Sequence, residues 1–180
     1  MSHHKRSGWF SPWQAAWINL RAMFVYGADF FLYKPGLLFL ALGLLLTLPL
    51  SFGAQTLGPI TFSMHWMLLG LALSILGLQC VYMGALSQVF FDYSGEITAR
   101  WFRRVPYTRT VALSVAASGV GVLMGGALTW EYVRNGFRLF EGRAINHLGI
   151  LGLLFAMGGF MTFTFTLLLH STAVVVWRRP

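Results

Sequence analysis

Residues 64–91 read MHWMLLGLALSILGLQCVYMGALSQVFF, and this stretch decides the fold because it contains no charged side chain. As a helix, at about 1.5 Å per residue, it would be about 42 Å long, which exceeds the ~30 Å hydrocarbon core of a bilayer. Similar apolar stretches cover residues 35–52, 111–130 and 145–177. Because peptide groups in hydrocarbon must be hydrogen bonded within their own segment, all four are expected to be helical. The sequence therefore predicts an all-α integral membrane protein with four transmembrane helices.

Small residues in these helices indicate how they pack. The third span has Ala117, Gly121 and Gly125 at four-residue spacing, and the second span includes Gly70 and Gly77. Small side chains in such rows let two helix backbones approach closely. These helices must pack against something, and we expect them to pack most economically against each other, in two hairpins.

The composition excludes several functional classes. The chain of 180 residues is 57% hydrophobic and 10% charged, which leaves no room for a second, water-soluble domain. Its single cysteine, Cys80, excludes an internal disulfide and a thiolate metal site, and no metal site is expected. None of the five carboxylates lies deep in a span, so the membrane interior offers no proton carrier for a pump. These carboxylates are Asp29, Asp92, Glu96, Glu131 and Glu141.

The basic residues predict the orientation in the membrane. Ten of the 13 Lys and Arg residues precede the first span, lie between the second and third, or follow the fourth. The other three lie between the third and fourth spans. By the positive-inside rule we expect both termini in the cytoplasm and the chain in the plasma membrane, the inner membrane of a bacterium. The net charge of +8 then reflects topology and contact with membrane lipids, and no nucleic-acid partner is expected.

The segment before the first span is expected to form a helix at the membrane surface. Pro12 suits the first turn of a helix and Ser11 suits its N-cap. Bulky apolar residues then recur on one face, at Trp13, Trp17, Leu20 and Phe24. We therefore assign residues 1–34 to a cytoplasmic N-terminus with an amphipathic interfacial helix. Residues 35–177 form the transmembrane domain, and residues 178–180 form a cytoplasmic C-terminus.

The connector between the second and third spans, residues 92–110, is long enough for a further short helix. In this helix Ile97, Trp101 and Phe102 would share one apolar face. For a helix in the membrane interface, that face is expected to contact lipid.

Three histidines are candidate ligands of a cofactor. His65 and His147 are expected near the outer ends of the second and fourth spans, and His170 lies nearer the cytoplasmic end. Two histidines at matched depth can hold a haem or a chlorophyll-type pigment. The alternative, which we favour, is that they are interfacial polar residues with water or headgroup partners. The cofactor stays open, with a bound lipid expected.

The stretch PWQAAWINLRAM, residues 12–23, resembles a junction in family 2 polyprenyl-phosphate glycosyltransferases. There a pattern such as P-W-x-D-G-W-x-x-L-R-x-M links the catalytic domain to a membrane anchor that opens with Pro-Gly. The chain departs from this pattern at Ala15 and Ala16, where the family often has Asp-Gly. The four-span layout is also similar to anchors of the dolichol-phosphate mannose synthase type. The residues that match are Pro12, Trp13, Trp17, Leu20, Arg21, Met23, Pro35 and Gly36.

The resemblance implies a membrane module without its own chemistry. The enzymes of this family carry an N-terminal nucleotide-sugar domain with an aspartate-rich metal motif, whereas here the sequence opens a few residues before the junction. We therefore expect the chain not to be an enzyme by itself, and it has no catalytic residues to assign.

Three functions remain open at this point. In the first, the chain is the membrane half of a split glycosyltransferase and holds a polyprenyl phosphate through guanidinium and ammonium groups. These would be Lys5, Arg6, Arg21, Arg100, Arg103 and Arg104, although each of them can also serve only to set topology. In the second, it is an accessory subunit of a larger membrane complex that can contain a cofactor or pigment. In the third, it is a small flippase-like transport protein. The expected partners are other membrane subunits or a separate catalytic subunit.

Overall fold

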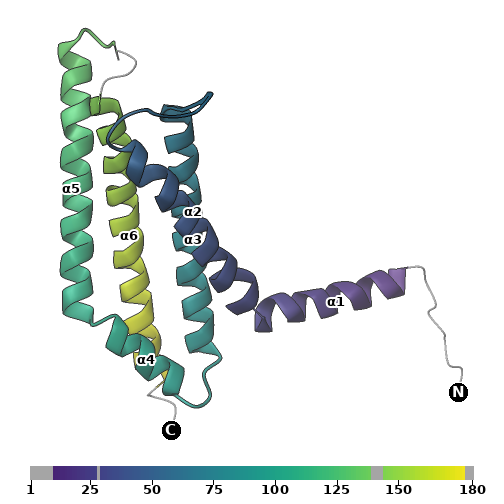
Figure 1. Ribbon diagram of the computed structural model, residues 1–180. Helices are drawn as coiled ribbons and strands as arrows, with labels where there is room; N and C mark the ends of the chain where they lie inside the picture. The colour runs from purple at the N-terminus through teal and green to yellow at the C-terminus, as the bar shows by residue number, and fades with distance from the viewer. Residues whose placement is uncertain (1–9, 28, 139–143, 177–180) are drawn as a thin grey trace, which may run out of the picture.

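The computed structural model describes residues 10–27, 29–138 and 144–176, and most of them are helical. Figure 1 shows four long helices side by side, which are α2 (Lys34–Leu50), α3 (Met64–Phe90), α5 (Tyr107–Arg134) and α6 (Ala144–Val176). Four segments among the described residues are long and apolar enough to cross a membrane. The predicted all-α transmembrane fold is therefore confirmed. The third of these helices extends beyond the predicted 111–130 at both ends.

The first hairpin pairs α2 with α3, and glycines allow their backbones to touch. A Cβ atom added at Gly43 would overlap the backbone nitrogen of Ser74, and one added at Gly77 would overlap the backbone nitrogen of Leu40. One added at Gly70 would lie 2.6 Å from Oγ1 of Thr47. The α2–α3 contact therefore depends on glycine along most of its length.

The second hairpin pairs α5 with α6 in the same manner. A Cβ atom added at Gly121 would overlap the backbone nitrogen of Ala156. Ala117 is half-buried, whereas nothing lies within 4 Å of a Cβ added at Gly125. Of the two glycines in this row, Gly121 is thus the one at which an added side chain would overlap α6, although a Cβ added at Gly152 would lie 3.1 Å from the backbone nitrogen of Gly125.

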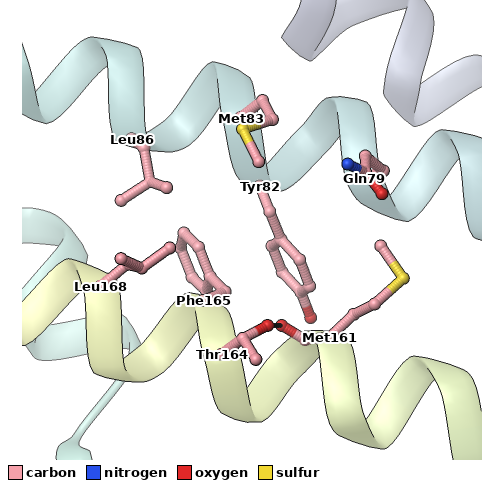
Figure 2. A pocket seen from close by; sticks show the side chains of 8 residues that line it. All are labelled: Gln79, Tyr82, Met83, Leu86, Met161, Thr164, Phe165 and Leu168. Carbon is pink, nitrogen blue, oxygen red and sulfur yellow. Dashed lines mark hydrogen bonds between the residues drawn. The ribbon is translucent and has the colours of Figure 1, made fainter.

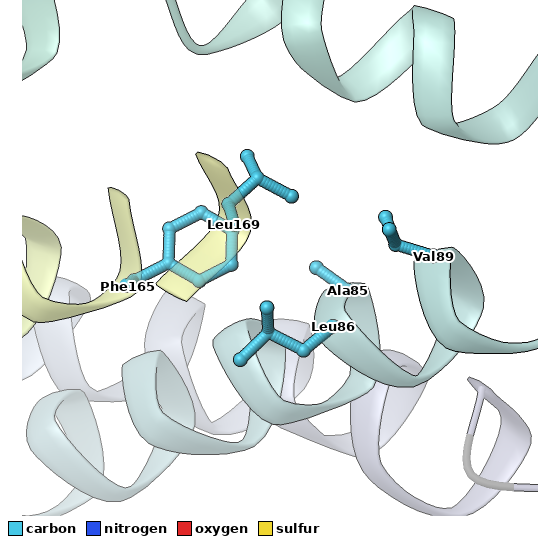
Figure 3. Packing of buried hydrophobic residues seen from close by; sticks show 5 residues of the cluster. All are labelled: Ala85, Leu86, Val89, Phe165 and Leu169. Atoms are coloured by element: carbon cyan, nitrogen blue, oxygen red, sulfur yellow. The ribbon is translucent and has the colours of Figure 1, made fainter. Parts of the chain in front are cut away.

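Two apolar clusters join the hairpins. Figure 3 shows Ala85, Leu86 and Val89 of α3 facing Phe165 and Leu169 of α6. At the opposite end of the bundle, Leu50, Met67 and Ile150 form the second cluster.

Shorter elements close the two ends of the bundle. The strands β1 (Gln55–Leu57) and β2 (Ile60–Phe62) form an antiparallel hairpin between α2 and α3, with Thr56 opposite Thr61. At the other end lie α4 (Glu96–Arg104), α1 (Phe10–Tyr26) and the π-helical turn η1 (Asp29–Tyr33) that leads into α2. Figure 1 shows α1 running away from the bundle at a steep angle to the four long helices. The two ends of the bundle are called the β-hairpin end and the α4 end.

The apolar face of α4 packs on the bundle. Trp101 and Phe102 are half-buried and contact the α3–α6 cluster, together with Val105. The expectation that Trp101 and Phe102 contact lipid is therefore wrong, because the cluster between α3 and α6 offers these rings a protein surface to cover.

Candidate functional site

The turn before α4 is held by a single carboxylate. One oxygen of Asp92 accepts hydrogen bonds from the backbone N–H and the hydroxyl of Thr98, at 2.7 and 2.8 Å. The other accepts from the hydroxyl of Ser94 at 2.9 Å and from the N–H of Gly95 at 3.0 Å. Gly95 has a φ of 76°, a left-handed conformation that suits glycine. Asp92 thereby satisfies N–H groups that the first turn of α4 leaves unpaired.

These hydrogen bonds keep Asp92 ionised. Partial burial by itself raises the pKa of this carboxyl group, but the hydrogen bonds from Thr98, Ser94 and Gly95 outweigh it. The pKa of Asp92 is lowered from its ordinary 3.8 to about 2. A negative charge therefore stays at the N-terminus of α4, where it also interacts favourably with the helix dipole.

Trp101 fixes the position of α4 against the bundle. Its indole N–H donates to Oε1 of Gln88 on α3 at 3.0 Å, and the amide of Gln88 donates in turn to Asp29 of η1. The Trp101 ring also meets Phe165 edge-on at 6.3 Å and Tyr33 edge-on at 6.1 Å between centroids. One indole ring thus connects α4 to two other segments. These are the last turns of α3 and the turn η1 that leads into α2.

The opposite face of α4 is basic and open. Arg100, Arg103 and Arg104 are all exposed, and we call these three residues the arginine face. The guanidinium carbon of Arg104 lies 6.0 Å from the centre of the Trp101 ring, in cation–π geometry. None of the three forms an ion pair with a residue that the structure describes. The arginine face is therefore available to an anionic group.

The other predicted phosphate ligands are not brought into this face. Arg21 is exposed on α1, which leaves the bundle at the same end (Figure 1). Lys5 and Arg6 lie outside the described residues. Two cations at this end were not among the predicted ligands, namely Lys34, which lies 5.1 Å from the Phe30 ring, and Arg109 near the start of α5. In the sequence, Lys34 and Arg109 are marked only as part of the excess of basic residues that predicted the topology.

The three histidines have different surroundings. His65 is exposed, whereas His147 is buried and its Nδ1 has no hydrogen-bond partner among the described residues. Nδ1 of His170 lies 3.0 Å from the carbonyl oxygen of Thr166, and its ring contacts Phe102 and Tyr107 edge-on. In the described part of the chain, no three His, Cys, Asp or Glu side chains are grouped as metal ligands. His65, His147 and His170 therefore do not share an open site in the described structure.

An apolar groove runs between α3 and α6 inside the membrane-spanning part. Figure 2 shows its lining, with Gln79 and Met161 at one end and Leu86 and Leu168 at the other. The open volume is about 350 Å³. Tyr82, which lines the groove, has its hydroxyl group hydrogen bonded to that of Thr162 at 2.6 Å, and its ring stacks on the ring of Phe165 at 4.3 Å between centroids. No pattern in the sequence marks this groove, because its lining depends on how the two hairpins meet.

A comparison with protein-family models identifies the second half of the chain. Residues 85–173 match the model described as the glycosyltransferase family 2 C-terminal transmembrane region. The match covers the last turns of α3, the connector with α4, and most of α5 and α6. Comparisons with curated proteins and with solved structures gave no match. The match does not include residues 12–23, but it points to the same family as the resemblance noted there: residues 85–173 are similar to the C-terminal transmembrane region of family 2 glycosyltransferases.

Proposed function

We propose that this membrane module of a glycosyltransferase holds a polyprenyl phosphate at its α4 end, with that end in the cytoplasm. The observation that carries the proposal is the arginine face. Guanidinium groups form charge-assisted, often bidentate hydrogen bonds to phosphate. Because Trp101 and Phe102 hold the apolar face of α4 on the bundle, these arginines are presented on a fixed helix. The phosphate would lie at the membrane surface and its hydrocarbon chain in the adjoining bilayer.

Local charge also supports an anion at this position. Asp92 is held by its own hydrogen bonds on the N-terminal side of α4, so it is not free to neutralise the arginines that follow. Glu96 precedes Arg100 by one turn but forms no ion pair with it in the described structure. The arginine face therefore has an unmatched positive charge at the depth where lipid phosphates lie.

The test compares two pairs of arginines at opposite ends of the bundle. The full chain is placed in nanodiscs of uncharged lipid, and binding of a polyprenyl phosphate is measured against the uncharged polyprenol of the same length. Replacing Arg103 and Arg104 with Gln is expected to weaken phosphate binding at least tenfold, about 1.4 kcal/mol, since charge-assisted hydrogen bonds contribute roughly 1.5–3 kcal/mol each. The control variant replaces Arg134 and Arg138 with Gln, which removes the same charge from the β-hairpin end.

Two results would contradict the proposal. One is an equal loss of affinity in both variants, which would indicate a general effect of net charge. The other is equal binding of the polyprenyl phosphate and the polyprenol, which would remove the role of the phosphate.

We also propose that glycosyl transfer is carried out by a separate catalytic subunit. Affinity purification of the full chain in a mild detergent, followed by mass spectrometry, tests this. A co-purifying nucleotide-sugar transferase supports a split enzyme. A stoichiometric set of other membrane subunits, with haem or pigment, would instead assign the chain as an accessory subunit.

A further inference from the structure

Gln79 is a polar side chain near the middle of a membrane-spanning helix. It lies two residues beyond the centre of α3, Met64–Phe90, or about 3 Å along the helix axis. Its side chain is exposed on the surface of the molecule, at the mouth of the groove beside Met161 (Figure 2). Among the described residues it has no hydrogen-bond partner. Within the hydrocarbon of a bilayer, both the N–H groups and the oxygen of this amide would be left unpaired.

Several threonines in the spans avoid this cost within their own helix. The hydroxyl groups of Thr47, Thr162 and Thr166 each donate to the carbonyl oxygen one turn earlier, at 2.7–2.8 Å. Leaving an amide without a partner in an apolar medium costs several kcal/mol. Lipid chains provide neither donors nor acceptors, so a partner for Gln79 has to come from another molecule.

Gln79 belongs to a regular row of exposed residues on α3. The row consists of Leu69, Ala72, Leu76, Gln79 and Met83, and we call it the α3 seam. Its spacings are three, four, three and four, as in the a and d positions of a left-handed helix pair. The opposite side of α3, with Gly70, Ser74 and Gly77, is buried against α2. The seam is thus the side of α3 that remains unpartnered in the monomer.

We infer that the α3 seam binds a second copy of this chain, with the two Gln79 side chains paired near a twofold axis. A twofold interface places each residue near its own counterpart. A primary amide suits this arrangement because its charge distribution is complementary to itself: the positive NH₂ of one Gln79 donates to the negative oxygen of the other. In this spacing Leu69, Leu76 and Met83 take a positions and Gln79 takes a d position, so its amide would lie within the contact between the two helices. The seam does not include the arginine face, so this inference does not depend on the proposed function.

Cysteine cross-linking in native membranes tests the contact. In a Cys80→Ala background, Leu76→Cys and Met83→Cys are expected to give disulfide-linked dimers on mild oxidation. Leu123→Cys is the control, because Leu123 is 74% exposed on α5 and lies outside the seam. Equal cross-linking at all three positions would overturn the inference, since it would reflect random collision.

The role of the amide is tested by energy transfer between labelled copies in liposomes, over a series of lipid dilutions. Gln79→Leu is expected to weaken dimerisation roughly three- to tenfold, the range for hydrogen bonds between membrane helices. Gln79→Asn, which keeps an amide, is expected to retain most of the dimer. Thr129→Val removes another exposed polar group, whose hydroxyl bonds to its own helix, and is expected to have no effect.

Four further outcomes would overturn the inference. The first is a protein that stays monomeric at every lipid dilution. The second is unchanged dimerisation in Gln79→Leu. The third is a cross-link at Leu76→Cys or Met83→Cys to a different protein, and the fourth is a lipid chain retained in the groove by monomeric protein. Either of these last two would show that another molecule covers the seam.

Discussion

At the scale of single residues, Asp92 illustrates how one side chain organises a connector. The sequence indicated a short helix in residues 92–110 but gave no cap for it. In the structure, Asp92 accepts hydrogen bonds from Thr98, Gly95 and Ser94, and these bonds set where α4 begins. The start of α4 therefore depends on the charge of one carboxylate.

Asp92→Ala is expected to loosen the first turn of α4 by about 1 kcal/mol, as for other lost N-caps. Hydrogen exchange at the amides of Gly95 and Thr98 should become about fivefold faster, measured by mass spectrometry on the protein in detergent. Ser94→Ala is the control, since it leaves the bonds of Asp92 to Thr98 and Gly95 in place and removes only the Ser94 hydroxyl, which donates to Asp92 and accepts from the N–H of Glu96 at 3.3 Å. Unchanged exchange in Asp92→Ala would show that packing of Trp101 alone holds the turn.

The pKa of Asp92 predicts how this turn responds to acid. A carboxylate whose pKa is lower in the folded state stabilises the fold above its unfolded pKa, and this stabilisation is lost as the pH falls through the folded value. For Asp92 the window runs from about pH 4 down to about pH 2. Protection of the Thr98 amide, corrected for intrinsic exchange, should fall across this window in the native chain. The same correction applied to Asp92→Ala should give a flat profile.

At the scale of the elements, backbone contact between helices distinguishes glycines that look alike in the sequence. Gly77 faces the α2 backbone, whereas a Cβ added at Gly126 on α5 would meet nothing within 4 Å. Both glycines lie inside apolar helices, and only the packing of the hairpins separates their roles.

Gly77→Val is expected to destabilise the fold by about 1–3 kcal/mol, the usual cost of forcing extra atoms into a packed contact. Gly126→Val, which adds the same atoms on an open face, should change the stability little. Reversible unfolding in mixed micelles, followed by far-ultraviolet circular dichroism, measures both. If the two variants lose equal stability, the effect comes from helix propensity and not from the α2–α3 contact.

At the scale of the whole molecule, two glycine-packed hairpins are joined through small clusters of larger side chains. Phe165 is 3% exposed and contacts both Tyr82 of α3 and Trp101 of α4. It therefore links the hairpins to each other and also supports the helix that presents the arginine face.

Phe165→Ala is expected to destabilise the molecule by about 3–5 kcal/mol, as for other buried aromatic side chains, and to speed hydrogen exchange throughout α4. Phe160→Ala is the matched control, because Phe160 lies on the same helix and is 63% exposed. Unfolding in mixed micelles and hydrogen exchange of α4 give the two measurements. Normal protection of α4 in Phe165→Ala would mean that the hydrogen bond of Trp101 to Gln88 is sufficient to hold it.

The sequence by itself determined the four helices, their pairing into hairpins and the basic excess at one end, because hydrocarbon imposes helical hydrogen bonding and small residues permit close backbones. It also suggested family 2 glycosyltransferases, the family whose C-terminal transmembrane region matches residues 85–173. Only the tertiary structure decided which side of each helix faces protein. It turned Trp101 inward and left Gln79 exposed, and it separated Gly121 from Gly125. In a membrane helix almost every face is apolar, so hydrophobic periodicity does not mark the buried side, and packing between the hairpins has to select it.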